Sequence, residues 1–275
     1  MILSRRTRIV LRVAMIGGLA VIYLPLLLVL LNSFNRNRSF AWPPAGITTE
    51  WWVRAWQSDG VRHALVASLQ AGAGATLVAL VLGTMTALAV QRYRFFGRRA
   101  VSFLVILPIA LPGIVTGIAL NAAFRAVLGP AGIGFGMLTV VIGHATFCVV
   151  VVFNNVVARL RRTSPSAEEA SADLGAHTFQ TFRHVTFPAL RPALLAGGIL
   201  AFALSFDEIV VTTFTAGPGL QTLPVWIYAN LARPNQAPVV NVVAAVLVLI
   251  SVVPIHLAQR LSADGPTAAP SPQSP

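Results

Sequence analysis

Six apolar runs, separated by short polar or arginine-bearing segments, dominate the hydrophobic pattern of the chain. They cover residues 13–31, 64–90, 100–124, 137–158, 193–215 and 239–259. A helix rises about 1.5 Å per residue, so about 20 apolar residues cross the hydrocarbon core of a bilayer. The pattern therefore predicts an all-α polytopic membrane protein with six transmembrane helices. A cleaved signal peptide is the alternative for the first run, but the run is longer than a usual signal core and no small-x-small site follows at residues 32–34.

The spacing of these runs divides the chain into three predicted parts. Residues 1–63 hold an N-terminal cytoplasmic segment, the first transmembrane helix and an extracytoplasmic loop. Within that loop, ITTEWWVRAW predicts a short interfacial helix with its indoles at headgroup level, with a cage for a cation as the alternative. Residues 64–259 form a five-helix transmembrane domain that includes a polar loop at 159–192, and the Pro-, Ala- and Ser-rich residues 260–275 form a disordered tail.

Composition supports the membrane assignment and excludes one kind of enzyme. Hydrophobic residues make up 56% of the chain, charged residues 10%, and the mean hydropathy is +0.77. All 20 basic residues are arginine, so a phosphate-binding loop of the GxxxxGK[ST] type is absent. The chain therefore does not hydrolyse ATP by that route, and we expect it not to be an enzyme.

The distribution of the arginines predicts which loops face the cytoplasm. In the six-helix arrangement 14 of them lie at the two termini and in the loops at 91–99 and 159–192, against 6 on the other side. Positive residues favour the cytoplasmic side, so both termini are predicted to be cytoplasmic. The net charge of +12 is explained by this bias, and no nucleic acid partner is expected.

Several features inside the runs predict packing. Small residues recur every four positions in the second run, at Ala71, Ala75, Ala79, Gly83 and Ala87. Pro108 and Pro112 should bend the third run, and Gly113 with Gly117 offers a GxxxG contact surface.

Two chemically distinct side chains stand in the fourth run. His144 is expected to be a neutral histidine bonded to a neighbouring helix, with a role in a pathway as the alternative. Cys148 is the lone cysteine and is expected to pack. No metal site or cofactor is expected.

The loop from Thr163 to Pro188 is a polar insertion between two long apolar runs. Ser166 and Glu169 have the spacing of a capping box, and Pro165 stands where a first-turn proline is tolerated. We expect a helix over residues 167–174, ended by Gly175, and a second segment over 178–186 before Pro188 and Pro192 break the pattern.

This loop resembles the EAA loop of importer permeases in the ATP-binding-cassette (ABC) superfamily. The match comprises Glu169, Ala170 and Ser171, then Gly175, then Val185, Phe187 and Pro188. Three positions depart mildly from the family pattern, because Ser171 replaces an alanine, Val185 an isoleucine and Phe187 a leucine.

The resemblance implies a coupling helix that sits in a cleft of a separate ATPase subunit. The residues it assigns to this coupling are Glu168, Glu169, Ala170, Ser171, Asp173, Gly175, Ala176 and Pro188. An ordinary amphipathic connector is the alternative.

Asp207 and Glu208 stand within the fifth run, in LSFDEIVVTTF. A charged side chain at membrane depth costs roughly 2.5 to 3.5 kcal/mol on insertion scales, so such groups face a polar cavity or a partner. On a continuous helix these neighbours would point about 100° apart. We interpret them as groups that attract a cation along a substrate pathway, and an ion pair between helices is the alternative.

A second resemblance covers most of the chain. The stretches ALLAGGILAFALSFDEIVVTTFTAG, TLPVWIY and PVVNVVA look like the second permease subunit of spermidine/putrescine importers. This resemblance implies a type I ABC importer permease fold in the bacterial inner membrane and a polyamine substrate. It also implies three partners, which are an ABC ATPase subunit dimer, a second permease subunit and an extracytoplasmic solute-binding protein.

Two rival functions remain open from the sequence. One is an importer of the same type for an anion, an amino acid or iron, which a basic pathway lining would have favoured. The other is a secondary transporter or channel, a class that often carries internal inverted repeats, of which we find no clear example here.

Overall fold

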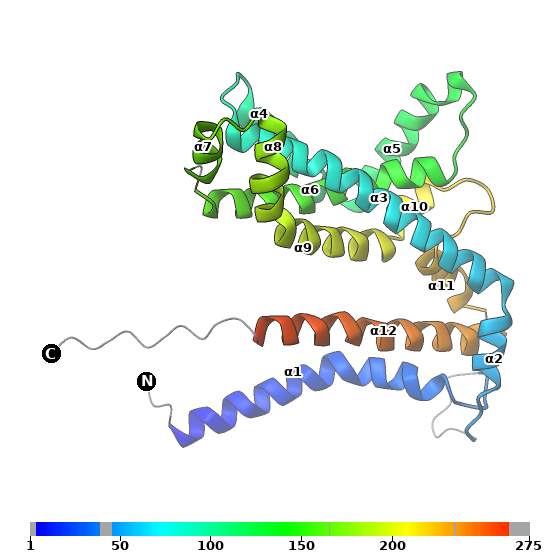
Figure 1. Cartoon of the computed structure of the whole chain (residues 1–275). Helices are drawn as coiled ribbons and strands as arrows, with labels where there is room; N and C mark the ends of the chain where they lie inside the picture. The colour runs from blue at the N-terminus through cyan, green and yellow to red at the C-terminus, as the bar shows by residue number, and fades with distance from the viewer. Residues whose placement is uncertain (1–3, 39–45, 165, 234, 264–275) are drawn as a thin grey trace. The chain divides into compact units, whose positions relative to one another are not determined.

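The structure is a computed structural model that describes residues 4–38, 46–164, 166–233 and 235–263, with side chains described up to residue 250. Within these residues the regular secondary structure is helical, apart from an isolated bridge between Asn35 and Ile47 (Figure 1). The helices are α1 (Arg5–Asn32), α2 (Glu50–Gln57), α3 (Asp59–Arg92), α4 (Arg98–Ala110), α5 (Gly113–Val127), η1 (Gly129–Ala131), α6 (Met137–Arg162), α7 (Ser166–Asp173), α8 (Thr178–Thr181), the π-helix η2 (Phe182–Thr186), α9 (Phe187–Phe206), α10 (Val210–Thr215), α11 (Leu223–Leu231) and α12 (Ala237–Ala263).

The chain divides into two compact units, residues 1–58 with 227–275, and residues 59–226. In the first unit α1 and α12 lie side by side and antiparallel (Figure 1). None of the described side chains of α1 is buried, so its apolar surface is available to hydrocarbon. The predicted tail, residues 260–275, lies mostly outside the described residues, and α12 extends to Ala263.

The predicted short helix with tryptophans is α2. Trp51 is buried and its Nε1 donates a hydrogen bond to the Asn35 carbonyl oxygen (2.9 Å), while Trp52 stacks on Phe34 with ring centroids 5.1 Å apart. Trp56 is 81% exposed. Two of these indoles therefore pack within the unit, and Trp56 remains available as an interfacial anchor. Trp42, also in the predicted loop, lies outside the described residues.

The second unit has a core of three long helices, α3, α6 and α9. The five small residues predicted as a stripe on α3 are all buried. A Cβ on Gly83 would lie 3.0 Å from the Val149 carbonyl oxygen and 3.0 Å from the Val152 Cβ of α6, so the backbones approach closely. This confirms the packing prediction. Cys148 is also buried, and its Sγ donates to the Ala201 carbonyl oxygen (3.3 Å).

The third predicted span is a broken pair of helices. The helical path bends by 110° between α4 and α5. Pro108 lies inside α4 and Pro112 caps α5, which places the bend at the predicted prolines. The GxxxG surface faces α10, where a Cβ on Gly117 would lie 2.6 Å from the Phe214 ring.

The number of membrane spans is only partly established by the described residues. Four helices are long and apolar enough to cross a bilayer, namely Arg5–Asn32, Asp59–Arg92, Met137–Arg162 and Thr178–Phe206. The broken α4–α5 pair counts as a fifth if it is one span, and α12 has a shorter described apolar stretch, Ala237–Ile250. The all-α, polytopic class is confirmed, and the sixth span stays a prediction.

Helix continuity through Pro188 and Pro192 contradicts the sequence analysis. Pro188 lies in the first turn of α9 and Pro192 lies inside it, so neither breaks the helix. The π-turn of η2 comes immediately before, and the Phe187 N–H bonds to the Phe182 carbonyl oxygen. Pro188, which has no N–H, is tolerated because it lies in the first turn of α9, directly after the wider π-turn of η2.

Candidate functional site

The polar loop forms a helical hairpin, residues 166–186, which we call the α7–η2 hairpin. Gly175 has φ +85°. Its N–H donates to the Ala172 carbonyl oxygen (2.9 Å), and the Ala176 N–H donates to the Ser171 carbonyl oxygen (3.1 Å). This pair of bonds is a Schellman ending, so the prediction that Gly175 ends the helix is confirmed.

The predicted capping box is wrong. Ser166 is the first residue of α7 rather than the residue before it, and its N–H donates to the Ser164 hydroxyl (3.3 Å) instead of to Glu169. The Ser164 side chain competes locally for this N–H, as serines near helix starts do. Pro165 lies outside the described residues.

Glu168 anchors the hairpin to the membrane helices. One of its carboxylate oxygens accepts hydrogen bonds from Arg92 Nη2 at the end of α3 (2.9 Å) and from the Thr186 hydroxyl of η2 (2.9 Å). Ser171 and Thr181 join the two arms through their hydroxyls (3.0 Å). The ion pair is three-quarters buried, so it is less screened than a surface pair.

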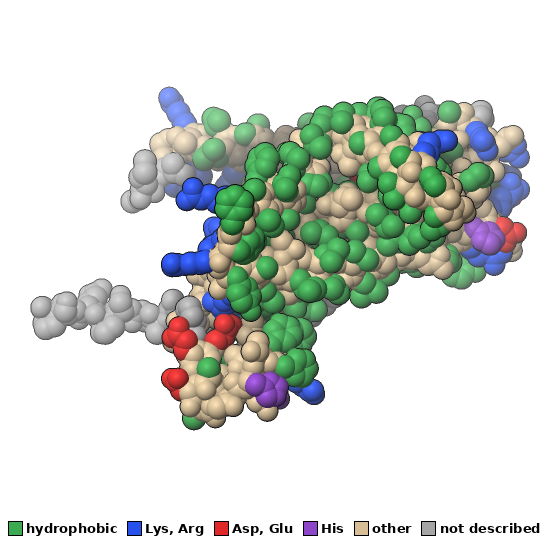
Figure 2. Space-filling view, turned by 90° about the horizontal axis from the view of Figure 1, so that it is seen from above, with side chains coloured by type: hydrophobic (Ala, Val, Ile, Leu, Met, Phe, Trp, Pro, Cys, Tyr) green, Lys and Arg blue, Asp and Glu red, His purple; other side chains and the backbone are tan. Residues whose placement is uncertain are grey.

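The outer face of the α7–η2 hairpin combines acidic side chains of α7 with exposed apolar side chains that follow α7. Glu169, Ala170 and Asp173 are exposed, Leu174 is 89% exposed and Phe179 is 63% exposed. Figure 2 shows acidic side chains gathered on one projecting lobe, in contrast to the apolar surface of the neighbouring helices. Of the predicted coupling residues, Glu168 and Ser171 therefore hold the hairpin, while Glu169 and Asp173 face outward.

Asp207 and Glu208 stand at a break in the helix. α9 ends at Phe206 and α10 begins at Val210. The Glu208 carboxylate accepts a hydrogen bond from the Val211 N–H (2.8 Å), so it caps α10, and Asp207 is exposed. The expectation of two acids on one continuous helix is thus wrong, because the helix breaks here and the Glu208 carboxylate satisfies the Val211 N–H at the start of α10.

His144 bridges this break from α6. Its Nδ1 hydrogen-bonds to the Ser205 hydroxyl at the end of α9 (2.7 Å), and its Nε2 to the Thr212 hydroxyl of α10 (2.8 Å). All three side chains are buried. The prediction that His144 bonds to a neighbouring helix is confirmed.

Glu208 also faces a cavity of about 180 Å³ at the bend of the other broken helix. Pro108 and Gly113, from either side of the α4–α5 bend, line it with Phe147. Asn121 Nδ2 donates to the Phe214 carbonyl oxygen (2.6 Å) and ties α5 to α10. Among the described residues, Asp207 and Glu208 form no ion pair with an arginine of this chain. An arginine from another subunit stays open as the alternative.

Replacing His144 with leucine is expected to destabilise the protein by about 1 to 3 kcal/mol, because the buried Ser205 hydroxyl loses its partner. The measurement is the free energy of unfolding of the purified chain in detergent micelles. His63→Leu, at an exposed position, is the control and should change it by less than about 0.5 kcal/mol. Equal losses in the two variants would show that the bridge contributes nothing to stability.

Long apolar helices, a helical hairpin outside them and paired acids at a helix break define a polytopic membrane protein of the transporter class. A family model described as binding-protein-dependent transport system inner membrane component matches residues 79–263, and the chain belongs to this family. It is accordingly a multi-pass inner membrane protein.

Three relatives from bacteria illustrate the similarity. The putrescine transport system permease protein PotI of Escherichia coli (strain K12) is 34% identical over 239 residues, which is 86% of this chain and 84% of that protein. The spermidine/putrescine transport system permease protein PotC of the same strain is 34% identical over 245 residues, covering 89% and 90%. The putative 2-aminoethylphosphonate transport system permease protein PhnV of Salmonella typhimurium (strain LT2) is 31% identical over 242 residues, covering 87% and 90%.

Two solved structures share the fold. A chain of a bacterial ABC transporter that imports the acidic polysaccharide alginate superposes with a TM-score of 0.69 at 16% identity, over 97% of this chain and 100% of that chain. A chain of the MetNI methionine ABC transporter superposes with a TM-score of 0.58 at 18% identity, over 78% and 97%. The predicted ABC importer permease fold is confirmed by these matches.

Proposed function

We propose that this chain is one of two transmembrane subunits of a binding-protein-dependent ABC importer that carries polyamines. The observation that carries the proposal is the 34% identity over 86% and 89% of the chain to permeases named for putrescine and spermidine. The chain itself binds and gates the solute and performs no covalent chemistry. Polyamines are polycations, so carboxylates beside the pathway lower their electrostatic energy there.

The acids at the break between α9 and α10 are the proposed contact with the cation. Glu208 uses one oxygen for the Val211 N–H and lies beside a cavity, and Asp207 is exposed. Two broken helices pack together at this point, because Gly113 and Gly117 of α5 lie against Val210 and Phe214 of α10. Helix breaks next to a cavity are common at solute sites of membrane transporters.

The α7–η2 hairpin is the proposed contact with an ABC ATPase dimer. Its outward Glu169, Asp173 and Leu174 supply charge and apolar area, while the Glu168–Arg92 pair transmits movement to α3. The ATP-bound and ADP-bound states of the ATPase dimer would shift the equilibrium between two arrangements of the membrane helices. In this proposal both termini are cytoplasmic, a second permease completes the pathway, and a solute-binding protein delivers substrate from outside.

Import of 2-aminoethylphosphonate is the second candidate, since PhnV is 31% identical over 87% of this chain. That solute carries a phosphonate anion, which the carboxylates of Asp207 and Glu208 would repel. A secondary transporter is the less favoured alternative, because a transporter driven by an ion gradient has no ATPase subunit for the α7–η2 hairpin to contact.

Reconstitution tests these possibilities. The chain is co-expressed with candidate ATPase, permease and binding-protein subunits, and the complex is placed in proteoliposomes. We expect uptake of radiolabelled putrescine or spermidine that requires ATP on the hairpin side. Uptake of 2-aminoethylphosphonate in place of polyamines would reject the substrate, and polyamine uptake driven by an ion gradient without ATP would reject the importer class.

A further inference from the structure

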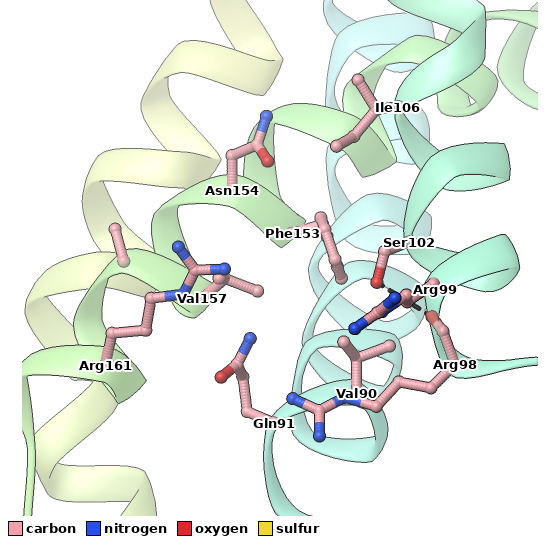
Figure 3. A pocket seen from close by; sticks show the side chains of 11 residues that line it. Val90, Gln91, Arg98, Arg99, Ser102, Ile106, Phe153, Asn154, Val157 and Arg161 are labelled. Carbon is pink, nitrogen blue, oxygen red and sulfur yellow. Dashed lines mark hydrogen bonds between the residues drawn. The ribbon is translucent and has the colours of Figure 1, made fainter. Parts of the chain in front are cut away.

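A basic cavity of about 720 Å³ lies between the end of α3, the start of α4 and the end of α6. Arg98 and Arg99 from α4 and Arg161 from α6 line it (Figure 3). In Figure 3 the guanidinium groups of Arg98 and Arg99 point from α4 towards α6, with Gln91 and Asn154 beside the same space. The cavity belongs wholly to the second unit.

The charge in this cavity is uncompensated. No carboxylate lines it, and within the described part of the chain none of its three arginines forms an ion pair. Glu168 forms its ion pair with Arg92, which lies outside the cavity. Arg98 and Arg99 also occupy the first turn of α4, where the helix dipole disfavours cations. An anion in the cavity would relieve both effects.

One wall of the cavity is apolar. Ile106, Phe153 and Val157 form it, and on α4 the neighbouring Phe103 and Leu104 are exposed. A basic pocket that continues into an exposed apolar helix surface fits a molecule with an anionic head and a hydrocarbon tail. A soluble anion would use the arginines and leave the apolar wall bare.

We propose that this cavity binds the phosphate of an anionic phospholipid, from the leaflet on the side of the α7–η2 hairpin, with an acyl chain along α4. Arginine suits this task, because its planar guanidinium makes paired hydrogen bonds to phosphate oxygens. Ser102, Gln91 and Asn154 supply further polar groups at the rim. The bound lipid joins α4 to α6, the helix that leads into α7 through Arg161 and Arg162.

The inference rests on the membrane family and not on the transported solute. It is tested on the full chain in detergent micelles, where binding needs neither ATPase nor substrate. Native mass spectrometry follows titration with dimyristoyl phosphatidylglycerol, and separate titrations use dimyristoyl phosphatidylcholine and inorganic phosphate. We expect phosphatidylglycerol to bind at least about tenfold more tightly than phosphatidylcholine, because the choline ammonium offsets the phosphate charge.

The test variant carries Arg98→Gln, Arg99→Gln and Arg161→Gln. At about fivefold per arginine near a charged lipid, it should bind phosphatidylglycerol about a hundredfold more weakly. The matched control carries Arg94→Gln, Arg162→Gln and Arg183→Gln, exposed positions that do not line the cavity and give the same net charge. This control should lose far less of its affinity for phosphatidylglycerol.

A second variant, Ala158→Phe, places a bulky side chain in the cavity from an exposed position without changing the charge. It should also abolish tight binding, and it keeps the test decisive if the triple variant does not fold. Full binding by Ala158→Phe, or equal losses in the two triple variants, would overturn the site. Displacement of phosphatidylglycerol by millimolar inorganic phosphate would overturn the lipid as the occupant in favour of a soluble anion.

Discussion

Gly175→Pro is expected to abolish ATP-driven uptake while leaving the chain in the membrane. Proline fixes φ near −65°, whereas Gly175 has φ +85°, and its N–H donates to the Ala172 carbonyl oxygen. The penalty is about 3 kcal/mol or more, so the native turn is populated at least about a hundredfold less. The measurement is uptake and solute-stimulated ATPase activity in proteoliposomes, with the amount of inserted protein determined in parallel.

Charge reversal on the outer face of α7 tests the same contact without disturbing the turn. Glu169→Lys replaces an exposed acid, and the control Glu50→Lys does so on α2, at the exposed Glu50–Arg54 pair. For the proline, the control is Gly134→Pro, at an exposed glycine without positive φ. Normal solute-stimulated ATPase activity in both hairpin variants would reduce the segment to an ordinary connector.

Features set by local chemistry could be predicted from the sequence. Gly175 ends α7 because the residues on either side favour helix and glycine takes positive φ at little cost. The stripe from Ala71 to Ala87 packs against α6 because small side chains at one helical spacing allow close approach. The apolar runs predicted the long helices, since an apolar composition requires burial in protein or lipid.

The particular partners of polar side chains that contact residues distant in the sequence could not be predicted. Glu168 was assigned to an ATPase contact, yet its carboxylate is taken by Arg92 and Thr186, which lie 76 and 18 residues away along the chain. The break after Phe206 is stabilised by His144, 61 residues before Ser205. A signal for the break was present, since an acid three residues before Val211 is a common cap of a helix start.

Asp207→Asn combined with Glu208→Gln is expected to weaken polyamine uptake by at least about tenfold. Each carboxylate 4 Å from an ammonium contributes between about 1 kcal/mol in water and about 4 kcal/mol near a protein surface, and both charges are removed. The glutamine keeps an oxygen that can accept from the Val211 N–H, so the start of α10 is preserved. The measurement is the substrate concentration that gives half-maximal uptake of putrescine and of spermidine.

The control for this pair is Glu50→Gln with Asp59→Asn, which removes the same charge from two exposed acids outside the helix break. Its uptake should match that of the unchanged protein. Spermidine carries one more ammonium than putrescine, so its uptake should fall further in the Asp207–Glu208 variant if both acids face the solute. Unchanged uptake of both polyamines would mean that Glu208 only caps α10 and that the cation finds its counter-charges elsewhere in the assembled pathway.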